Sequence, residues 1–444
     1  MRSMVLPRFK NLIFEIFPSL KAKEIQTLLD NVASLSLLQI VNYILPLITL
    51  PYLLRVLAPE KYGLFAFSLV FIQYVLVFTN YGFNLAGTRD IAIYKDNKPK
   101  INEIVNSIFL IKGILTITSF IFLSIIVLTV EMFNRDALFF FLSFGIVIGD
   151  LFFPVWLFQG LEKMRYISIL NCISKIVFTV LIFVLVKNPS DYIIVPLINS
   201  LGYLVIGMLS LIIIIRKFAI YPEVPSLKAI KHQLHEGWYI FISTISVSGY
   251  RLLPTIILAS LFSYEIVAYY SVGDQIIRAA LNMINPFTQS LFPLMSRKFH
   301  ESIDQGLSFV SSILRRITCL PLGFSIVIFI LSDIVVNIIA GSEYAESITV
   351  LRIFSFLPLI VFVANIFGNQ IMLNVNLKSS FSRILVAGGI ISVLVQGLLI
   401  PTMSITGAAI SVFLTEFAVM LMMVQSVKCN LDERQWRILR WYTS

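Results

Sequence analysis

The sequence predicts an all-α integral membrane protein with about twelve transmembrane helices. Of the 444 residues, 58% are hydrophobic and only 13% are charged, and the mean hydropathy is +0.90. Soluble domains average about 45–50% apolar and about 25% charged residues. Apolar runs of about 20 residues, the length that a bilayer core of ~30 Å requires, recur throughout. The composition therefore excludes a soluble globular enzyme and a disordered scaffold.

Twelve apolar runs are long enough to cross a membrane as helices. They fall into two sets of six, with a polar connection between the sixth and the seventh. The predicted spans are residues 31–57, 62–83, 104–130, 136–158, 166–186, 191–215, 237–262, 266–295, 317–340, 348–374, 380–401 and 405–427.

The connections between these spans differ sharply in positive charge. Alternate connections, counted with the two ends of the chain, hold 25 Lys and Arg residues, whereas the opposite connections hold only Arg55, Lys61, Arg135 and Lys187. Because positive loops stay on the cytoplasmic side, both termini are predicted to be cytoplasmic. The net charge of +10 is thus explained by membrane topology, and no nucleic-acid partner is expected.

The residues at both ends of the chain are of the kinds that bind at a membrane surface. In residues 1–30 apolar side chains recur at helical spacing among Lys and Arg, and the tail after residue 427 combines Trp436 and Trp441 with several Arg residues. An amphipathic helix at the interface fits this pattern. A solvated tail that merely follows the charge rule is the alternative. The N-terminus lacks the pattern of a cleaved signal peptide, so none is expected.

Metal and cofactor chemistry has no sequence support. Cys172, Cys319 and Cys429 are far apart, without a CxxC motif, and the three His residues lie outside the apolar runs. We therefore expect no metal site, no cofactor and no disulfide framework. The predicted exterior connections are also too short for a catalytic domain, which argues against an enzyme.

The chain contains a weak internal repeat. Residues 57–65 (LAPEKYGLF) are similar to residues 262–270 (FSYEIVAYY), and Asn80 falls on Asn285 at the same offset of 205 residues. Since six spans separate the copies, the halves would be parallel repeats, an arrangement typical of transporters with a binding site between them. Chance similarity between apolar helices is the alternative.

Residues 50–63 (LPYLLRVLAPEKYG), 80–84 (NYGFN) and 88–92 (TRDIA) resemble Wzx-type polysaccharide flippases of the multidrug/oligosaccharidyl-lipid/polysaccharide exporter superfamily. Later segments look like further landmarks of that family, and the resemblance runs from about residue 31 to residue 427. These later segments are residues 267–270 (VAYY), 292–293 (FP), 341–344 (GSEY) and 365–374.

This resemblance implies two six-helix lobes around a central cavity. It also implies translocation of undecaprenyl-diphosphate-linked O-antigen repeat units across a bacterial inner membrane, with membrane lipids and the O-antigen polymerase machinery as further partners. The expected organisation is an N-terminal segment (1–30), an N-lobe (31–215), a cytoplasmic linker (216–236), a C-lobe (237–427) and a cytoplasmic tail (428–444).

Two departures from related groups bear on the substrate. Span 1 has no carboxylate after Asp30, whereas many drug-extruding relatives place a cation-coupling acid there, and peptidoglycan-precursor flippases typically have fourteen spans rather than twelve. Both departures favour the O-antigen branch. A cation-coupled multidrug or small-molecule antiporter of the same superfamily remains the alternative function.

Ionisable groups inside the hydrocarbon cost roughly 2.5–3.5 kcal/mol each and usually face a cavity or a partner. Arg251 is the sharpest case, because it lies midway along its span without an acid within one helical turn. Its guanidinium suits a lipid diphosphate, and a structural salt bridge to Asp150 or Glu416 is the alternative. The five bases proposed for diphosphate or cavity contacts are Arg251, Arg278, Lys112, Lys175 and Arg352, with contacts to lipid headgroups as the alternative for the last three.

The acids in the spans have two interpretations. Asp274 and Arg278 are four residues apart, so they share a helix face and are expected to neutralise each other, with substrate phosphate competing for Arg278 as the alternative. Asp150 and Glu416 either bind a coupling proton or sodium ion or pair with the excess bases. Asp333, near the end of its span, is expected to lie at the interface.

A polar stripe in the first span completes the candidate site. Gln39 and Asn42 are expected to face the cavity and contact sugar hydroxyls, and Pro46 and Pro51 are expected to bend the helix. Hydrogen bonding between helices explains the same polar residues equally well.

Overall fold

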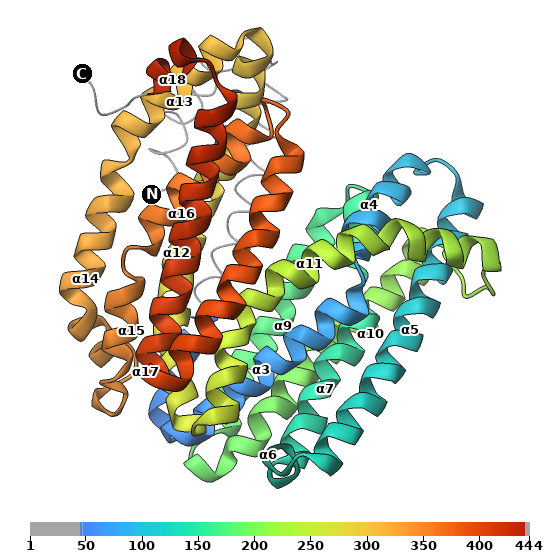
Figure 1. Ribbon diagram of the computed structural model, residues 1–444. Coiled ribbons are helices and arrows are strands. Elements are labelled where there is room, and N and C mark those ends of the chain that lie inside the picture. Colours follow the sequence, from blue (N-terminus) through green and yellow to red (C-terminus); the bar gives the residue numbers. More distant parts are fainter. Residues whose placement is uncertain (1–44, 47, 440–444) are drawn as a thin grey trace, which may run out of the picture.

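The computed structural model describes residues 45, 46 and 48–439 of the chain, without the side chains of residues 243, 246, 247, 249, 250 and 283–294. Regular structure in these residues is helical throughout, as predicted. Figure 1 shows two helical bundles that meet at the lower end of the view and diverge toward the upper end. We call the blue-to-green bundle the N-lobe and the yellow-to-red bundle the C-lobe.

The N-lobe follows a short helical stretch over residues 48–56. Its helices are α3 (Pro59–Asn80), α4 (Phe83–Ile93), α5 (Lys98–Thr129), α6 (Glu131–Arg135), α7 (Ala137–Leu151), α8 (Val155–Gly160), α9 (Met164–Leu185), the 3₁₀ turn η1 (Pro189–Ile193) and α10 (Ile194–Phe218).

The C-lobe begins with two long helices and ends with a helical hairpin. Its elements are α11 (Leu227–Leu261), α12 (Tyr264–Glu301), α13 (Ile303–Ile317), α14 (Cys319–Ile339), the 3₁₀ turn η2 (Ser342–Tyr344), α15 (Ser347–Phe354), α16 (Leu357–Asn365), the π-helix η3 (Ile366–Met372), α17 (Lys378–Asn430) and α18 (Glu433–Leu439).

In the described part of the chain, eight helical stretches are long and apolar enough to cross a membrane. One of them, α17, contains two arms, because the backbone reverses at Ser404, which has φ 50°. The long helices α11 and α12 add two further spans that are more polar. With the first predicted span, which lies mostly outside the described residues, the chain has about twelve spans.

Two predicted spans are interrupted. Span 4 is divided into α7 and α8 at residues 152–154, where Pro154 has no N–H to donate to a helix. Span 10 is divided into α15, α16 and the π-helix η3, with Pro358 at the start of α16. The structure also contains an amphipathic helix that was not predicted, α13, whose apolar face, including Leu307 and Val310, is buried.

The distribution of hydrophobic cores explains the shape of the molecule. One core is shared by both lobes and joins Leu64 and Phe67 of α3 to Val267 of α12. Two further cores each lie within one lobe, around Trp156 in the N-lobe and around Phe362 in the C-lobe. The lobes are therefore packed together at one end, which we call the closed end, and separate toward the other.

The closed end depends on a very close approach between α3 and α12. A Cβ atom added to Gly63 would lie 1.7 Å from the carbonyl oxygen of Tyr264, so a side chain cannot be accommodated there without a backbone shift. Arg55 Nη2 also donates to the carbonyl oxygen of Ile338 at 2.6 Å. Both contacts join the first half of the chain to the second.

The first half of α11 packs on the N-lobe although the rest of the helix belongs to the C-lobe (Figure 1). Arg89 donates to Glu236 at 2.5 Å, and Gln233 Nε2 donates to the buried Asp90 at 3.0 Å. The hydrogen bond from Arg89 lowers the pKa of Glu236. Residues 216–236, expected as a linker, thus include the start of α11 at Leu227.

The tail forms the short helix α18, which packs against α13. Leu439 is buried, and Arg434 lies 3.5 Å from Asp304 of α13. The predicted surface helix in residues 1–30 and the predicted polar stripe of Gln39 and Asn42 lie outside the described residues.

Candidate functional site

A cavity of about 740 Å³ lies between the two lobes. The N-lobe contributes residues of the 48–56 stretch, α3 and the start of α4, and the C-lobe contributes residues of α11 and α12. Its volume is in the range of about 300–1,000 Å³ found for small-molecule sites. The position agrees with the expectation of a central cavity between two lobes.

The lining residues follow helical stripes. On α3 they are Tyr62, Phe65, Leu69, Val70, Gln73, Leu76, Val77 and Asn80. On α11 they are Ile240, Thr244, Ser248, Arg251, Leu252 and Thr255, and on α12 they are Ser271, Asp274, Gln275 and Arg278. Spacings of three and four residues place each set on one face of its helix, so each of these helices presents a single face to the cavity.

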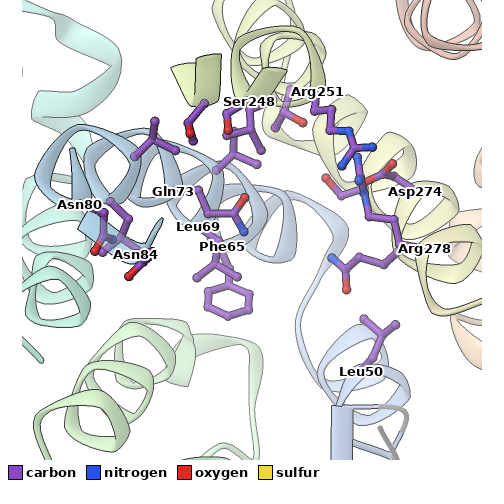
Figure 2. A pocket seen from close by; sticks show the side chains of 18 of the residues that line it. Leu50, Phe65, Leu69, Gln73, Asn80, Asn84, Ser248, Arg251, Asp274 and Arg278 are labelled. Carbon is purple, nitrogen blue, oxygen red and sulfur yellow. The ribbon is translucent and has the colours of Figure 1, made fainter. Parts of the chain in front are cut away.

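The charge in this lining comes from the C-lobe. Figure 2 shows Arg251, Asp274 and Arg278 gathered at one side of the pocket, with Asn80 and Asn84 at the other. Arg278 Nε donates to Asp274 Oδ2 at 2.5 Å, and the side chains of the pair are 41% and 19% exposed. The prediction that these two residues share a helix face and pair is confirmed.

Arg251 is different, because no carboxylate of the described residues lies within 4 Å of its guanidinium. Glu416 of α17 is half-buried and close enough for the charges of Arg251 and Arg278 to act on it, but it is not among the cavity-lining residues. Among the described residues, the lining therefore carries two guanidinium groups and one carboxylate, a net charge of +1.

Lys112 and Asp150 form a separate ion pair within the N-lobe. The Lys112 ammonium lies 3.0 Å from Asp150 Oδ2, 3.1 Å from the Asp150 carbonyl oxygen and 3.0 Å from Asn80 Oδ1. Asn80 Nδ2 in turn donates to Asp150 at 3.1 Å. Lys112 is only 2% exposed, and neither member of the pair lines the cavity. Asp150 is thus engaged with Lys112 rather than with Arg251.

Two other predicted bases lie away from the cavity. Arg352 forms an ion pair with Asp333, and its Nε donates to Ser332 Oγ at 3.2 Å. Lys175 is half-buried on α9 and is not a lining residue. Of the five predicted bases, Arg251 and Arg278 are brought together at the cavity.

Several neutral polar residues of the site were not predicted. Gln275 Nε2 donates to the hydroxyl of the buried Tyr62 at 2.7 Å, which links α12 to α3 at the cavity wall. Gln73, Asn84 and Ser248 also line the cavity. A signal for Gln73 was present in the sequence, because it corresponds to Arg278 at the repeat offset of 205 residues.

Residues 28–299 match the family model of polysaccharide biosynthesis proteins. The chain is 34% identical over 403 residues to a putative O-antigen transporter of Escherichia coli (strain K12), an alignment that covers 90% of this chain and 96% of the relative.

Two solved structures are similar in fold. The lipid II flippase MurJ, in an inward closed conformation, superposes with a TM-score of 0.67 at 12% identity over 92% of this chain and 90% of its own. An inward-facing multidrug transporter of the MATE family in the MOP superfamily gives 0.70 at 11% identity, covering 92% and 96%. The two-lobed fold expected from the sequence is therefore confirmed.

Proposed function

The chain belongs to the polysaccharide biosynthesis protein family, and from this membership we propose that it is a flippase for lipid-linked O-antigen repeat units. In this proposal an undecaprenyl-diphosphate-linked oligosaccharide passes from the cytoplasmic to the periplasmic leaflet of a bacterial inner membrane. The name of the 34%-identical relative, a putative O-antigen transporter, supports this substrate class.

One observation carries the proposal: Arg251 and Arg278 face the cavity, and Asp274 is the one carboxylate among the lining residues that the structure describes. A lipid diphosphate is the most highly charged part of the proposed substrate. Guanidinium groups bind phosphate oxygens with two parallel hydrogen bonds, and the interaction strengthens where water is partly excluded. We assign the diphosphate to this side of the cavity.

The rest of the lining suits a sugar. Gln73, Asn80 and Asn84 on the N-lobe side and Ser248 and Gln275 on the C-lobe side supply amide and hydroxyl groups. Such groups both donate and accept hydrogen bonds, as sugar hydroxyls do. In this pose the oligosaccharide lies along α3 and its diphosphate lies against α11 and α12.

The distribution of cores supports alternating access as the mechanism of the proposed flippase. The shared core and the approach of Gly63 to Tyr264 close one end, whereas the N-lobe and C-lobe cores are separate at the other. The positive segments that contain Lys95, between α4 and α5, and Arg434, in α18, lie at the separated end (Figure 1). With positive loops in the cytoplasm, the cavity here is loaded from the cytoplasmic side, and both termini are cytoplasmic.

The same pair offers a route for coupling. A proton or a sodium ion on Asp274 would weaken its hold on Arg278 and free the guanidinium for the diphosphate. Glu416 of α17, whose charge interacts with those of both guanidiniums, is a second candidate to bind the coupling ion. In this proposal the flippase needs no cofactor beyond the coupling ion.

A cation-coupled drug antiporter is the second candidate, favoured by the lining carboxylate of Asp274 and by the MATE-like fold. The net charge of +1 disfavours it for the cationic drugs that such a carboxylate would attract. Deletion of the gene separates the two functions, because only the flippase proposal predicts loss of surface O-antigen with unchanged drug susceptibility.

The decisive variant in cells is Arg251→Ala. We expect at least a tenfold fall in surface O-antigen at matched expression, since hydrogen bonds to charged groups contribute about 1.5–3 kcal/mol. Arg251→Lys should recover export only in part, because the ammonium keeps the charge but loses the planar fork. Normal O-antigen display by Arg251→Ala would exclude Arg251 as a substrate contact.

A further inference from the structure

A second cavity lies on the outer side of the N-lobe, between α5 and α10. It has a volume of about 520 Å³ and is lined almost entirely by apolar side chains. Leu110, Ile114 and Ile117 of α5 line it and are 42%, 55% and 63% exposed, so it opens on the surface that faces the bilayer. We call this cavity the outer groove.

The outer groove exists because α7 stops short. The helix ends at Leu151, and the chain turns away through residues 152–154 before α8 begins. Leu151 and Phe152 form the floor of the groove, between the walls made by α5 and α10. Gly113 leaves further space, because a Cβ atom placed there would have no neighbour within 4 Å. The outer groove thus results from the early end of α7 and from the absence of a side chain at Gly113.

A polar cavity of about 450 Å³ adjoins the outer groove at Asn106, which lines both. One wall of the polar cavity is formed by residues 223–226, in a segment that side-chain hydrogen bonds hold against α5. Asn106 Nδ2 donates to the carbonyl oxygen of Tyr221 at 2.9 Å, and Asn106 Oδ1 accepts from the Glu223 amide at 3.1 Å. Ser226 Oγ donates to Glu103 at 2.7 Å. The polar cavity is therefore preformed.

We propose that these adjoining cavities bind one phospholipid, with an acyl chain in the outer groove and a zwitterionic headgroup with a primary ammonium, as in phosphatidylethanolamine, in the polar cavity. The bilayer is the medium on which the groove opens, so a lipid is the occupant that reaches it. The site lies outside the cavity between the lobes and does not depend on the proposed transport function.

The charges of the polar cavity select the headgroup. Lys100 pairs with Glu103 at 2.8 Å, and an ammonium has three N–H groups, so Lys100 retains donors for a phosphate. Glu223 also lines the cavity and has no ion-pair partner among the described residues. With two carboxylates and one ammonium, the cavity is complementary to a headgroup that carries its own positive charge and less so to an anionic one.

Native mass spectrometry of the full-length protein tests the proposal. The protein is equilibrated in nanodiscs of phosphatidylethanolamine and phosphatidylglycerol and then released into mild detergent. We expect the wild type to keep one phosphatidylethanolamine per chain with at least fivefold preference over phosphatidylglycerol. Equal retention of the two lipids, or no retained lipid, would overturn the proposal.

Two glycine substitutions provide a matched comparison. Gly113→Phe fills the outer groove and should lower retained phosphatidylethanolamine at least fivefold. Gly323→Phe, on α14, also introduces a ring where a Cβ atom has no neighbour within 4 Å, but outside the groove, and should bind as the wild type does. Wild-type binding by Gly113→Phe would overturn the proposal. Should that variant fail to fold, Leu110→Trp fills the groove from its exposed side and is judged by the same criterion.

The headgroup is tested by Glu223→Gln. This variant should retain a lipid but lose the preference, so that phosphatidylethanolamine exceeds phosphatidylglycerol by less than twofold. A preference that stays at the wild-type level contradicts the assigned headgroup contact.

Discussion

Helices α3 and α12 occupy equivalent places in the two lobes, yet they present different chemistry to the cavity between them. They begin at Pro59 and Tyr264, which are separated by the repeat offset of 205 residues. At that offset Leu69, Val70 and Gln73 correspond to Asp274, Gln275 and Arg278, and all six line the cavity. The repeat fixes which face of each helix lines the cavity, whereas the residues on that face determine whether it carries charge.

The N-lobe also has a pair of opposite charges in its spans, and these two face each other. Lys112 and Asp150 are bonded together with Asn80 inside the bundle, whereas Arg251, Asp274 and Arg278 lie at the cavity surface. A buried base with three oxygen partners is a structural element, and a cavity base without a carboxylate partner is available to a ligand. Variants in the two lobes should therefore fail in different ways.

The largest effect is expected for Lys112→Met. Removing the ammonium leaves Asp150 uncompensated in the bundle, and breaking a buried pair costs about 3–5 kcal/mol. The variant should accumulate poorly in the membrane. The double variant Lys112→Met/Asp150→Asn should accumulate near the wild-type level and retain export, as measured by immunoblot and surface O-antigen. A double variant that accumulates but does not export would place this pair in the transport cycle and remove the contrast between the lobes.

A smaller loss of stability is expected at the closed end, where α3 and α12 approach each other. Gly63 corresponds to Ala268, and a methyl group at position 63 would meet the Tyr264 carbonyl oxygen. Overpacking of this kind costs about 1–3 kcal/mol, so Gly63→Ala should lower the thermal midpoint of the purified protein. Gly323→Ala, in open space on α14, is the control and should leave the midpoint unchanged. Equal midpoints for both variants would show that the closed end is looser than the structure indicates.

The smallest effect on accumulation is expected for the cavity pair. Asp274 and Arg278 are partly exposed, so removing either one should cost about 1–2 kcal/mol, between the values for exposed and buried pairs. Asp274→Asn and Arg278→Gln should each accumulate slightly less than the double variant. All three should export poorly, in contrast to the N-lobe double variant. Normal accumulation of both single variants would mean that the pair contributes nothing to stability.

Much of this contrast was predictable from the sequence, but only where local spacing contains the information. Spacing along one helix identified the pair of Asp274 and Arg278, and the position of Arg251 in its span marked it as a cavity base. The partner of Asp150 was not predictable, because it depends on how α5 packs against α7. Gln73 was missed because its signal, the correspondence to Arg278 in the internal repeat, does not come from spacing along its own helix.

The fold shows the same division between local and tertiary information. Apolar length predicted the number of spans, because the thickness of the bilayer fixes the length of helix that crosses it. The breaks at Pro154 and Pro358 had a local signal, the proline itself, but a prediction based only on the length of apolar runs does not use it. The amphipathic helix α13 had helical periodicity, but its apolar face is explained only by the C-lobe core that it covers.

The central claim is that the charged face of the C-lobe binds the diphosphate of a lipid carrier. It is tested most directly by the affinity of purified protein in nanodiscs for a polyprenyl diphosphate, measured for the wild type, Arg251→Ala and Arg352→Ala. Arg352 is the matched control, since it is a span arginine paired with Asp333 outside the cavity. We predict at least a tenfold loss of affinity for Arg251→Ala and an unchanged affinity for Arg352→Ala. Equal affinities for the wild type and Arg251→Ala would contradict the claim.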